Sequence, residues 1–184
     1  MNVLQNVPEE VITRAKGVRL LAMDVDGVLS DGRLYFSANG DELKAFNILD
    51  GLGIKLLQRA GILTALITGR HSPLTARRAG DLGIIHLYQG RDDKLQALQE
   101  LASDLHLTLA ECAYIGDDLP DLGAIRAAGL GVTVPNGYWQ VRQAAHWCTS
   151  TGGGQGAVRE LSDLILAAQG QLQPILRSFE QEPD

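Results

Sequence analysis

Two aspartates one residue apart, Asp24 and Asp26, follow an apolar run in the segment "VRLLAMDVDGV". Side chains at positions i and i+2 of an extended segment point to the same side, so the two carboxylates are predicted to share one space and to repel each other. A divalent cation offsets such repulsion, and Mg²⁺ is the usual choice where phosphate is bound as well. One aspartate can then bind metal and attack phosphorus while the other moves a proton. The pair therefore predicts phosphoryl chemistry.

Further positions supply the other groups that phosphoryl transfer requires. Asp117 in "YIGDDLPD" adds a carboxylate after another apolar run, Lys94 in "GRDDK" offers counter-charge, and Thr68 in "ITGR" offers a donor for phosphate oxygens. Taken alone, Thr68 fits an ordinary turn and Lys94 fits a solvated helix. Asp118 and Asp121 fit the first turn of a helix as well as a metal site. The order of these positions along the chain is what favours the chemical interpretation.

Short apolar runs alternate with amphipathic segments, a pattern typical of βαβ units and a doubly wound, mostly parallel α/β sheet. Strands are expected at residues 18–24, 62–68, 84–89, 112–117 and 130–135. Helices are expected at residues 51–60, 73–82, 92–106, 119–128 and 156–169. In such a sheet ligands bind beyond the carboxyl ends of the strands, where the strand order reverses. Asp24, Thr68 and Asp117 end predicted strands, and Lys94 opens the helix after another strand, so these residues are expected to meet there.

One segment interrupts the alternation. Residues 33–46 contain Asn39-Gly40, a turn signal between two short runs, and predict a β-hairpin inserted after the first strand. The tail, residues 171–184, is polar and is expected to be extended or mobile.

The intervals between the motifs are too short for a separate cap domain. Asp26 to Thr68 already contains the hairpin and a helix, and Lys94 to Asp117 is filled by one helix. A chain of 184 residues is therefore predicted to form one domain over residues 1–184.

The composition excludes several classes of protein. A net charge of −6 and a pI near 5.2 argue against nucleic acid as a partner. Cys112 and Cys148 stand in no CxxC pattern, so neither a disulfide framework nor a zinc site is expected. No stretch approaches the roughly 18 apolar residues of a membrane span, and the first residues lack the apolar centre of a signal peptide. A cytoplasmic protein that does not bind membranes is expected.

The segments "DVDGVLSDG", "ITGR", the lysine of "GRDDK" and "GDDLPD" resemble the four motifs of the haloacid dehalogenase-like phosphatases. The nearest resemblance is to the 3-deoxy-D-manno-octulosonate 8-phosphate phosphatases. It implies that Asp24 is the nucleophile that becomes an aspartyl phosphate and that Asp26 is the acid and then the base. It also implies Mg²⁺ on the Asp24 carboxylate, the Asp26 carbonyl and Asp117, supported by Asp118 or Asp121. Thr68 and Lys94 would hold the phosphoryl group.

The resemblance also implies how a phosphorylated sugar acid is bound. Arginine and lysine suit a sugar that carries a carboxylate. The implied substrate contacts are Asp26, Asn47, Ile48, Leu49, Asp50, Gly51, Lys55, Arg70, Arg78 and Lys94. The chain departs from the pattern at Leu49 and Gln155, where relatives often carry arginine, and this bears on which sugar is bound.

The absence of a cap suggests that another chain closes the site. The resemblance implies a homotetramer in which residues 33–46 of one subunit cover the site of the next, with residues 152–184 also contributing in trans.

Three alternatives compete with this interpretation. One is a phosphatase of a related sugar acid, such as a nine-carbon keto acid. The second is a phospho-accepting signalling receiver, whose acidic pair would come first in the chain, whereas here Asp-x-Asp comes first. The third is a regulatory or assembly domain without catalysis, against which stands the presence of every catalytic residue.

Overall fold

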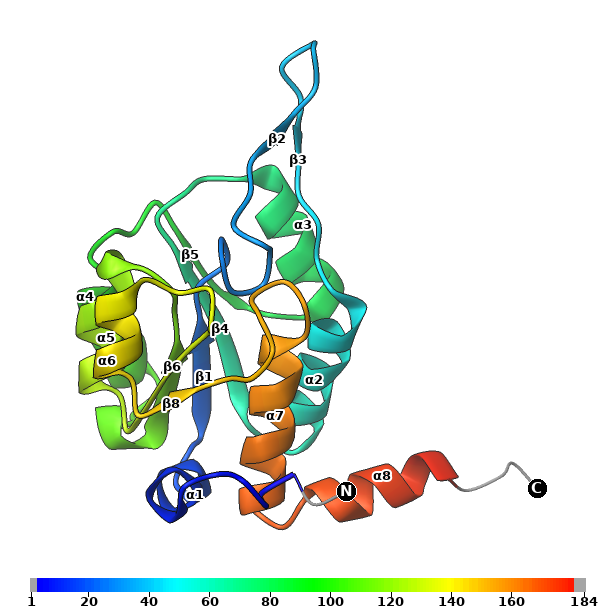
Figure 1. Cartoon of the computed structure of the whole chain (residues 1–184), viewed down its shortest axis with the longest axis vertical. Helices are drawn as coiled ribbons and strands as arrows, with labels where there is room; N and C mark the ends of the chain where they lie inside the picture. Colours follow the sequence, from blue (N-terminus) through cyan, green and yellow to red (C-terminus); the bar gives the residue numbers. More distant parts are fainter. Residues whose placement is uncertain (1–2, 181–184) are drawn as a thin grey trace.

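A parallel β-sheet forms the centre of the structure, a computed structural model that describes residues 3–180 (Figure 1). Within these residues the sheet has six strands in the order β5-β4-β1-β6-β7-β8, and each neighbouring pair is parallel. The strands are β1 (Leu20–Met23), β4 (Leu63–Thr68), β5 (His86–Gln89), β6 (Cys112–Ile115), β7 (Leu130–Thr133) and β8 (Trp147–Cys148). The chain adds β4 and β5 on one side of β1 and then β6, β7 and β8 on the other, so the strand order reverses at β1. The predicted doubly wound α/β fold is confirmed.

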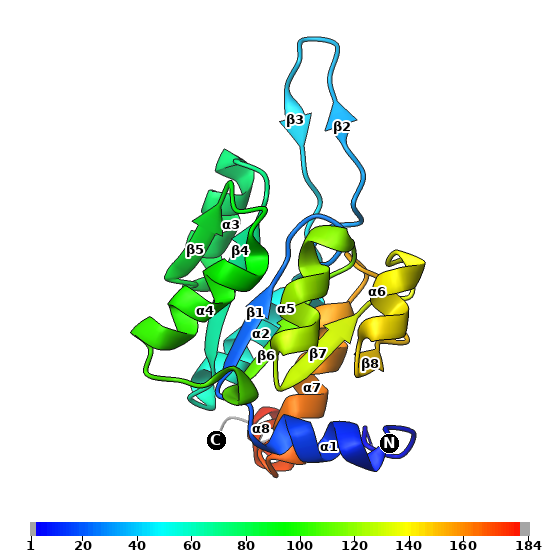
Figure 2. The same cartoon turned by 90° about the vertical axis from the view of Figure 1, so that its left-hand side faces the viewer.

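Helices cover both faces of this sheet (Figures 1 and 2). One face is covered by α2 (Ile48–Arg59), α3 (Pro73–Leu82) and α7 (Ala157–Ala168), with α1 (Glu9–Lys16) packed against α7. The other is covered by α4 (Lys94–Asp104), α5 (Leu122–Ala127) and α6 (Trp139–Ala144). Short 3-10 turns, η1 (Leu109–Glu111) and η2 (Leu119–Asp121), precede β6 and α5. No helix among residues 3–180 combines the length and the apolar character that crossing a bilayer requires.

Strand β1 shows why the apolar runs lack alternation. Leu20 and Ala22 pack into the core beneath α4 and α5, whereas Leu21 and Met23 pack into the core beneath α2 and α7. All four are fully buried. A strand covered on both faces needs an apolar side chain at every position, and this fixes β1 at the centre of the sheet.

The predicted hairpin is present and rises beyond the carboxyl edge of the sheet (Figure 2). Its strands are β2 (Tyr35–Phe36) and β3 (Glu42–Leu43), which are antiparallel. Gly40 has a φ of +86°, the left-handed conformation that the tight turn requires. We call residues 33–46 the arm.

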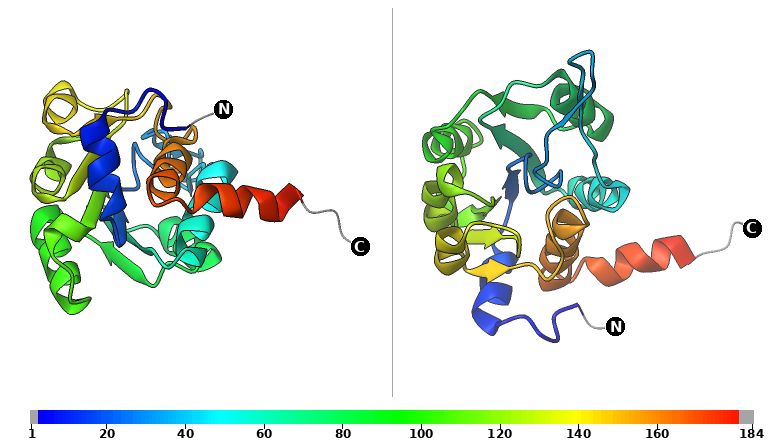
Figure 3. Two further views of the ribbon diagram at one scale, coloured as in Figure 1. Left: turned by 90° about the horizontal axis from the view of Figure 1, so that it is seen from below. Right: turned by 45° about the horizontal axis from the view of Figure 1, so that its top comes forward.

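The prediction for the tail is wrong over most of its length. Residues Leu172–Glu180 form helix α8, which extends away from the body of the molecule (Figure 3). Its apolar residues recur at helical spacing, and Leu172 is buried, whereas Leu176 and Phe179 are exposed. This periodicity outweighs the polar composition of the segment. Residues 181–184 lie outside the described part.

Several short elements were not predicted. Helices α1 and α6 and strand β8 are each eight residues or fewer. Segments this short carry too few apolar repeats for a periodic signal to stand out.

Candidate active site

The site begins directly after β1, at the point where the strand order reverses. The backbone N–H of Asp24 donates to the carbonyl of Ile115 on β6 at 3.0 Å. β4 lies on the other side of β1 and ends at Thr68. Asp117 lies two residues after the end of β6. Because these strands are parallel neighbours, the three residues lie at one edge of the sheet, as their positions after apolar runs predict.

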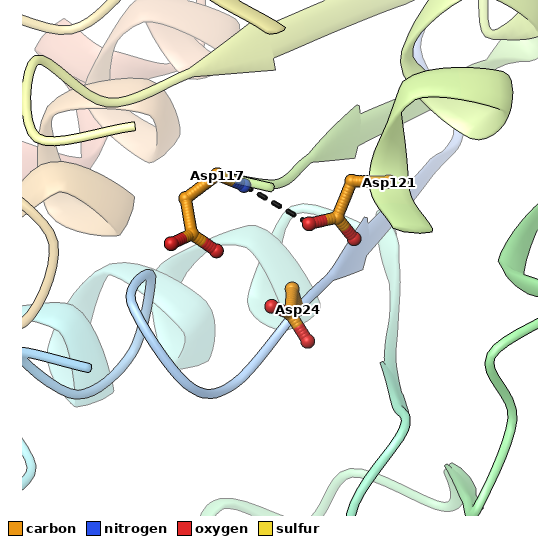
Figure 4. Close-up of side chains that lie close together, drawn as sticks. All are labelled: Asp24, Asp117 and Asp121. Atoms are coloured by element: carbon orange, nitrogen blue, oxygen red, sulfur yellow. Dashed lines mark hydrogen bonds between the residues drawn. The ribbon is translucent and has the colours of Figure 1, made fainter. Parts of the chain in front are cut away.

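Three carboxylates converge at this edge (Figure 4). Oxygen atoms of Asp24, Asp117 and Asp121 all lie within 4.8 Å of one another. Asp24 is 5% exposed and Asp121 is fully buried. This arrangement concentrates negative charge out of water, which is costly without cationic partners.

Lys94 is one such partner. Its ammonium group, at the first residue of α4, lies 2.7 Å from Asp24 Oδ1 and 2.7 Å from Asp121 Oδ1. Its side chain is 5% exposed. An ammonium group has three N–H donors, so one more donor is left after these two contacts.

Asp121 has no oxygen lone pair left for a further ligand. Its Oδ1 accepts from Lys94 and from the Tyr114 hydroxyl at 2.7 Å each, and its Oδ2 accepts from the backbone N–H groups of Asp117 and Asp118. These four bonds use the capacity of a carboxylate. The geometry favours Asp121 as a support for Lys94 and for the backbone of Asp117. Asp118 instead accepts from the N–H of Leu119 and is exposed.

The pKa values of these groups report the crowding of charge. Burial, and then the charge of Asp121, raise the pKa of Asp24 well above its ordinary range. The same two causes raise the pKa of Asp117 to about 6. Burial disfavours the charged form of Lys94, but Asp24 and Asp121 outweigh it and raise the pKa of Lys94. Lys94 therefore stays charged at neutral pH. The positive charge near Asp24 and Asp117 does not balance the negative charges of their two ionised carboxylates.

The donor set at Asp24 and Asp117 fits a divalent metal. Oxygen atoms of the two side chains lie within 4.8 Å of each other, close enough to share one cation. A hard cation takes carboxylate oxygens as ligands and favours their ionised forms. It would thereby reverse the pKa shifts that burial and Asp121 impose.

A glycine brings the loop after β1 against Asp117. Gly27 has a φ of +94°, and a Cβ atom there would overlap the Asp117 carboxylate. Asn136, after β7, fixes the same loop: its Nδ2 donates to the Gly27 carbonyl at 3.3 Å and its Oδ1 accepts from Gly153 N at 2.8 Å. Asn136 was not predicted from the sequence, since an Asn-Gly pair after a strand is typical of any turn.

Asp26 lies in this loop and is held from a different direction. Lys44 of the arm forms an ion pair with Asp26 Oδ1, and Arg70, two residues beyond β4, places its Nε 3.9 Å from Asp26 Oδ2. Ser30 Oγ is 3.5 Å from Asp26 Oδ1. Arg70 is a predicted substrate contact, whereas Lys44 was not predicted, because a lysine at the base of a hairpin is usually exposed.

Thr68 is buried at the end of β4, the strand that pairs with β1. Its hydroxyl oxygen accepts from the backbone N–H of Arg70 at 3.3 Å. The hydroxyl hydrogen is thus available to a neighbouring acceptor.

The predicted substrate stretch is the start of α2. The side chain of Asn47 caps this helix by accepting from Leu49 N at 2.9 Å, and Ile48 and Leu49 are exposed. Asp50 is 1% exposed and accepts from the backbone N–H of Arg159 at 2.8 Å, near the start of α7. In this subunit Asp50 serves the packing of α2 against α7, and its role toward the substrate stays a prediction.

The structure separates two cations that the sequence analysis grouped together. Arg78 donates to the carbonyl of Asn47 at 3.1 Å, and a Cβ on Gly51 would collide with its guanidinium. Arg78 therefore holds the start of α2. Lys55 directs its ammonium group toward Gly83, which ends α3 near the opposite edge of the sheet from Asp24. The structure does not bring Lys55 to the Asp24 cluster of the same subunit.

Fold and site together define a phosphoryl-transfer centre at the switch point of a doubly wound sheet. The sequence model for haloacid dehalogenase-like hydrolases matches residues 79–161. The 3-deoxy-D-manno-octulosonate 8-phosphate phosphatase of Yersinia pestis is 49% identical over 167 residues, which cover 91% of this chain and 89% of the relative. The enzyme of the same name from Salmonella typhi is 46% identical over 90% of this chain and 88% of its own.

A solved structure is also similar. The crystal structure of 3-deoxy-D-manno-octulosonate 8-phosphate phosphatase from Moraxella catarrhalis, in complex with magnesium, phosphate and the sugar acid, has a TM-score of 0.91. It is 50% identical and covers 92% of this chain and 98% of its own. The chain belongs to the haloacid dehalogenase-like hydrolases, in the family of the 3-deoxy-D-manno-octulosonate 8-phosphate phosphatases. It is a phosphomonoesterase.

Proposed function

We propose that this enzyme hydrolyses 3-deoxy-D-manno-octulosonate 8-phosphate to the free sugar acid and phosphate, a step in lipopolysaccharide precursor synthesis. The observation that carries the proposal is the buried contact between Asp24 and Lys94, with Asp26 two residues further along the same loop. The Moraxella relative, 50% identical, was crystallised with phosphate and the sugar acid. This combination supports both the reaction and the substrate.

In the first step an Asp24 oxygen attacks phosphorus, and the bond between phosphorus and the sugar oxygen breaks. Asp26 gives its proton to the departing sugar oxygen, so the sugar leaves as an alcohol. Lys94 holds Asp24 Oδ1, which leaves Asp24 Oδ2 to attack.

In the second step water attacks the phosphorus of the aspartyl phosphate and Asp26, now ionised, takes the proton of that water. Phosphate leaves and the Asp24 carboxylate is restored. Asp26 thus gives a proton and recovers one, and the cycle balances.

The phosphoryl group needs donors around its oxygens as it transfers. The third N–H of Lys94, which contacts Asp24, and the hydroxyl of buried Thr68 at the end of β4 would fill this role. Lys94 would neutralise charge, and Thr68 would fix orientation.

Asp24, Asp117 and the backbone carbonyl of Asp26 would hold Mg²⁺. When bound, the cation supplies positive charge that stabilises the transferring phosphoryl group. The crowded carboxylates of Asp24 and Asp117 support a divalent ion here, and the magnesium in the Moraxella structure favours Mg²⁺.

The sugar acid would contact the start of α2, from Asn47 to Gly51, together with Arg70. Arg70 lies next to Asp26 and carries the charge that a carboxylate requires. Lys55 and Arg78 are retained as predicted contacts.

We also propose a homotetramer with sites completed in trans. The arm and the start of α2 expose a group of large apolar side chains, which comprises Leu34, Tyr35, Phe36, Leu43, Ile48 and Leu49. Exposed apolar groups of this kind mark interaction surfaces. Residues 33–46 and 152–184 are the proposed contacts, and the cytoplasmic location stays a prediction.

A screen of phosphorylated sugars with Mg²⁺ tests the proposal. The enzyme is expected to prefer 3-deoxy-D-manno-octulosonate 8-phosphate, in kcat/KM, over a phosphorylated nine-carbon keto acid and over neutral sugar phosphates. Preference for the nine-carbon acid would change the substrate assignment, and preference for a neutral sugar would contradict an acidic substrate. Stable phosphorylation without turnover would revive the receiver alternative, which the family relationship disfavours.

A further inference from the structure

A lysine of the arm is buried against the residue proposed to move the proton. The side chain of Lys44 is 2% exposed, and its ammonium group forms an ion pair with Asp26 Oδ1. Lys44 directly follows β3, more than a dozen residues from Asp26 along the chain. Only the folding of the arm brings the two together.

The pair belongs to a ring of alternating charges at the base of the arm. Glu42 Oε1 lies 3.9 Å from the Lys44 ammonium and 3.3 Å from Arg70 Nη2. The ring closes through Arg70 Nε, 3.9 Å from Asp26 Oδ2. It joins the arm, the loop after β1 and the loop after β4.

Local geometry explains why the arm supplies two members. Glu42 and Lys44 are at positions i and i+2 of an extended segment, so their side chains point to the same side. An ammonium group removed from water is stable only next to negative charge. Asp26 and Glu42 supply that charge, and Asp26 is the nearer one.

We propose that Lys44 is a positioning residue that holds the Asp26 carboxylate in place for proton transfer and so couples the placement of the arm to the chemistry. The inference rests on the proposed function. Lys44 neither gives nor takes a proton in this scheme. Its ion pair, with Arg70 on the other oxygen, restricts the rotation of the Asp26 side chain. An arm that moved would release that restriction.

The test compares substrates whose leaving groups need a proton to different degrees. The sugar of a sugar phosphate leaves as an alkoxide unless its oxygen is protonated, whereas p-nitrophenyl phosphate releases a stable anion. Lys44→Met keeps the length of the side chain and removes the charge. It is expected to lower kcat/KM at least about tenfold for the sugar phosphate and less than about twofold for p-nitrophenyl phosphate. Lys44→Arg is expected to restore most of the loss.

A double-mutant cycle shows whether Lys44 acts through Asp26. In an Asp26→Asn background, Lys44→Met is expected to cause no further loss of kcat/KM for the sugar phosphate. Lys16→Met, which removes the charge of an exposed lysine in α1, is the matched control and is expected to change the kcat/KM of neither substrate. Glu42→Gln changes a second member of the ring. It is also expected to lower kcat/KM more for the sugar phosphate than for p-nitrophenyl phosphate, by a smaller factor than Lys44→Met does.

Three results would overturn the inference: an unchanged Lys44→Met enzyme, an equal loss on both substrates, or a further loss in the Asp26→Asn background. An unfolded Lys44→Met protein, seen by thermal unfolding, moves the same test to Glu42→Gln and Lys44→Arg. The proposed function fails separately, if Asp26→Asn itself shows no selective loss on the sugar phosphate or if wild type does not prefer the acidic sugar.

Discussion

Asp24 and Asp26 lie one residue apart, yet different regions of the molecule hold them. Asp24 contacts Lys94 at the start of α4, within the carboxylate cluster at the sheet edge. Asp26 contacts Lys44 at the base of the arm, in a partly exposed ring of charges. Asp24 and Asp121 of the cluster are buried in the centre of the fold, whereas the ring depends on an insertion that rises away from it (Figure 1).

This difference fits the two proposed roles, in which Asp24 attacks phosphorus and Asp26 moves a proton. A nucleophile needs a fixed position relative to phosphorus, and strands buried on both faces supply it. A proton carrier must meet two partners in turn, the sugar oxygen and water. Placement by an insertion makes the position of Asp26 depend on the arm, whereas the position of Asp24 does not. Variants in the two regions should therefore have distinct signatures.

The largest effect is expected in the cluster, for Asp24→Asn. An amide cannot form the aspartyl phosphate, so kcat should fall on the order of 10⁴-fold or more for the sugar phosphate and the aryl phosphate alike. The thermal midpoint should not fall, because the variant removes a buried charge that Asp121 disfavours. Asp24→Ala is the control for slow deamidation of the asparagine. Turnover close to wild type in both variants would contradict the nucleophile assignment.

An intermediate effect is expected for Asp117→Asn, measured as stability without metal. The raised pKa of about 6 means that the folded state binds the Asp117 proton more tightly than the unfolded chain, where the pKa is about 3.9. The resulting destabilisation is absent below about pH 4 and complete above about pH 6. The variant should therefore exceed wild type by about 1–3 kcal/mol in the free energy of unfolding at pH 7.

Urea unfolding in the presence of a chelator, from pH 4.5 to 7.5, measures this difference. The difference in the free energy of unfolding should grow as pH rises and then level off. Groups common to both proteins contribute equally and cancel from this difference. A difference that does not change with pH would remove the electrostatic explanation. Adding Mg²⁺ should stabilise wild type and leave Asp117→Asn nearly unchanged, and removing it by chelation should reversibly stop turnover of wild type.

The smallest effect on the chemical step is expected in the exposed part of the arm. Phe36 is 63% exposed, and Phe36→Asp places a charge in the proposed contact surface. Light scattering should show a smaller assembly than wild type, and KM for the sugar acid should rise about three- to tenfold. The kcat for p-nitrophenyl phosphate should stay within about twofold of wild type, because Asp24 and Lys94 are untouched. A tetramer of unchanged stability would place the subunit contacts elsewhere.

Much of the fold could be predicted because its signals are local. The four residues before Asp24, Leu20–Met23, are all apolar, which is typical of a strand buried on both faces. Gly83 ends α3 in the left-handed conformation expected of a helix C-terminus. Asn39-Gly40 similarly located the hairpin. Helix α8 was missed because its polar composition concealed a short periodic pattern.

For the site, the sequence by itself determined which carboxylates follow strands, and therefore that Asp24 and Asp117 meet at one edge. Parallel strands in a doubly wound sheet leave no other outcome. Only the tertiary structure decided how each remaining charge is used. In the folded chain both oxygens of Asp121 accept hydrogen bonds, Lys55 points toward the opposite edge of the sheet, and the Lys44 side chain is buried against Asp26. These outcomes depend on contacts between segments distant in the chain, where side-chain direction and loop path decide the partner, and spacing along the sequence records neither.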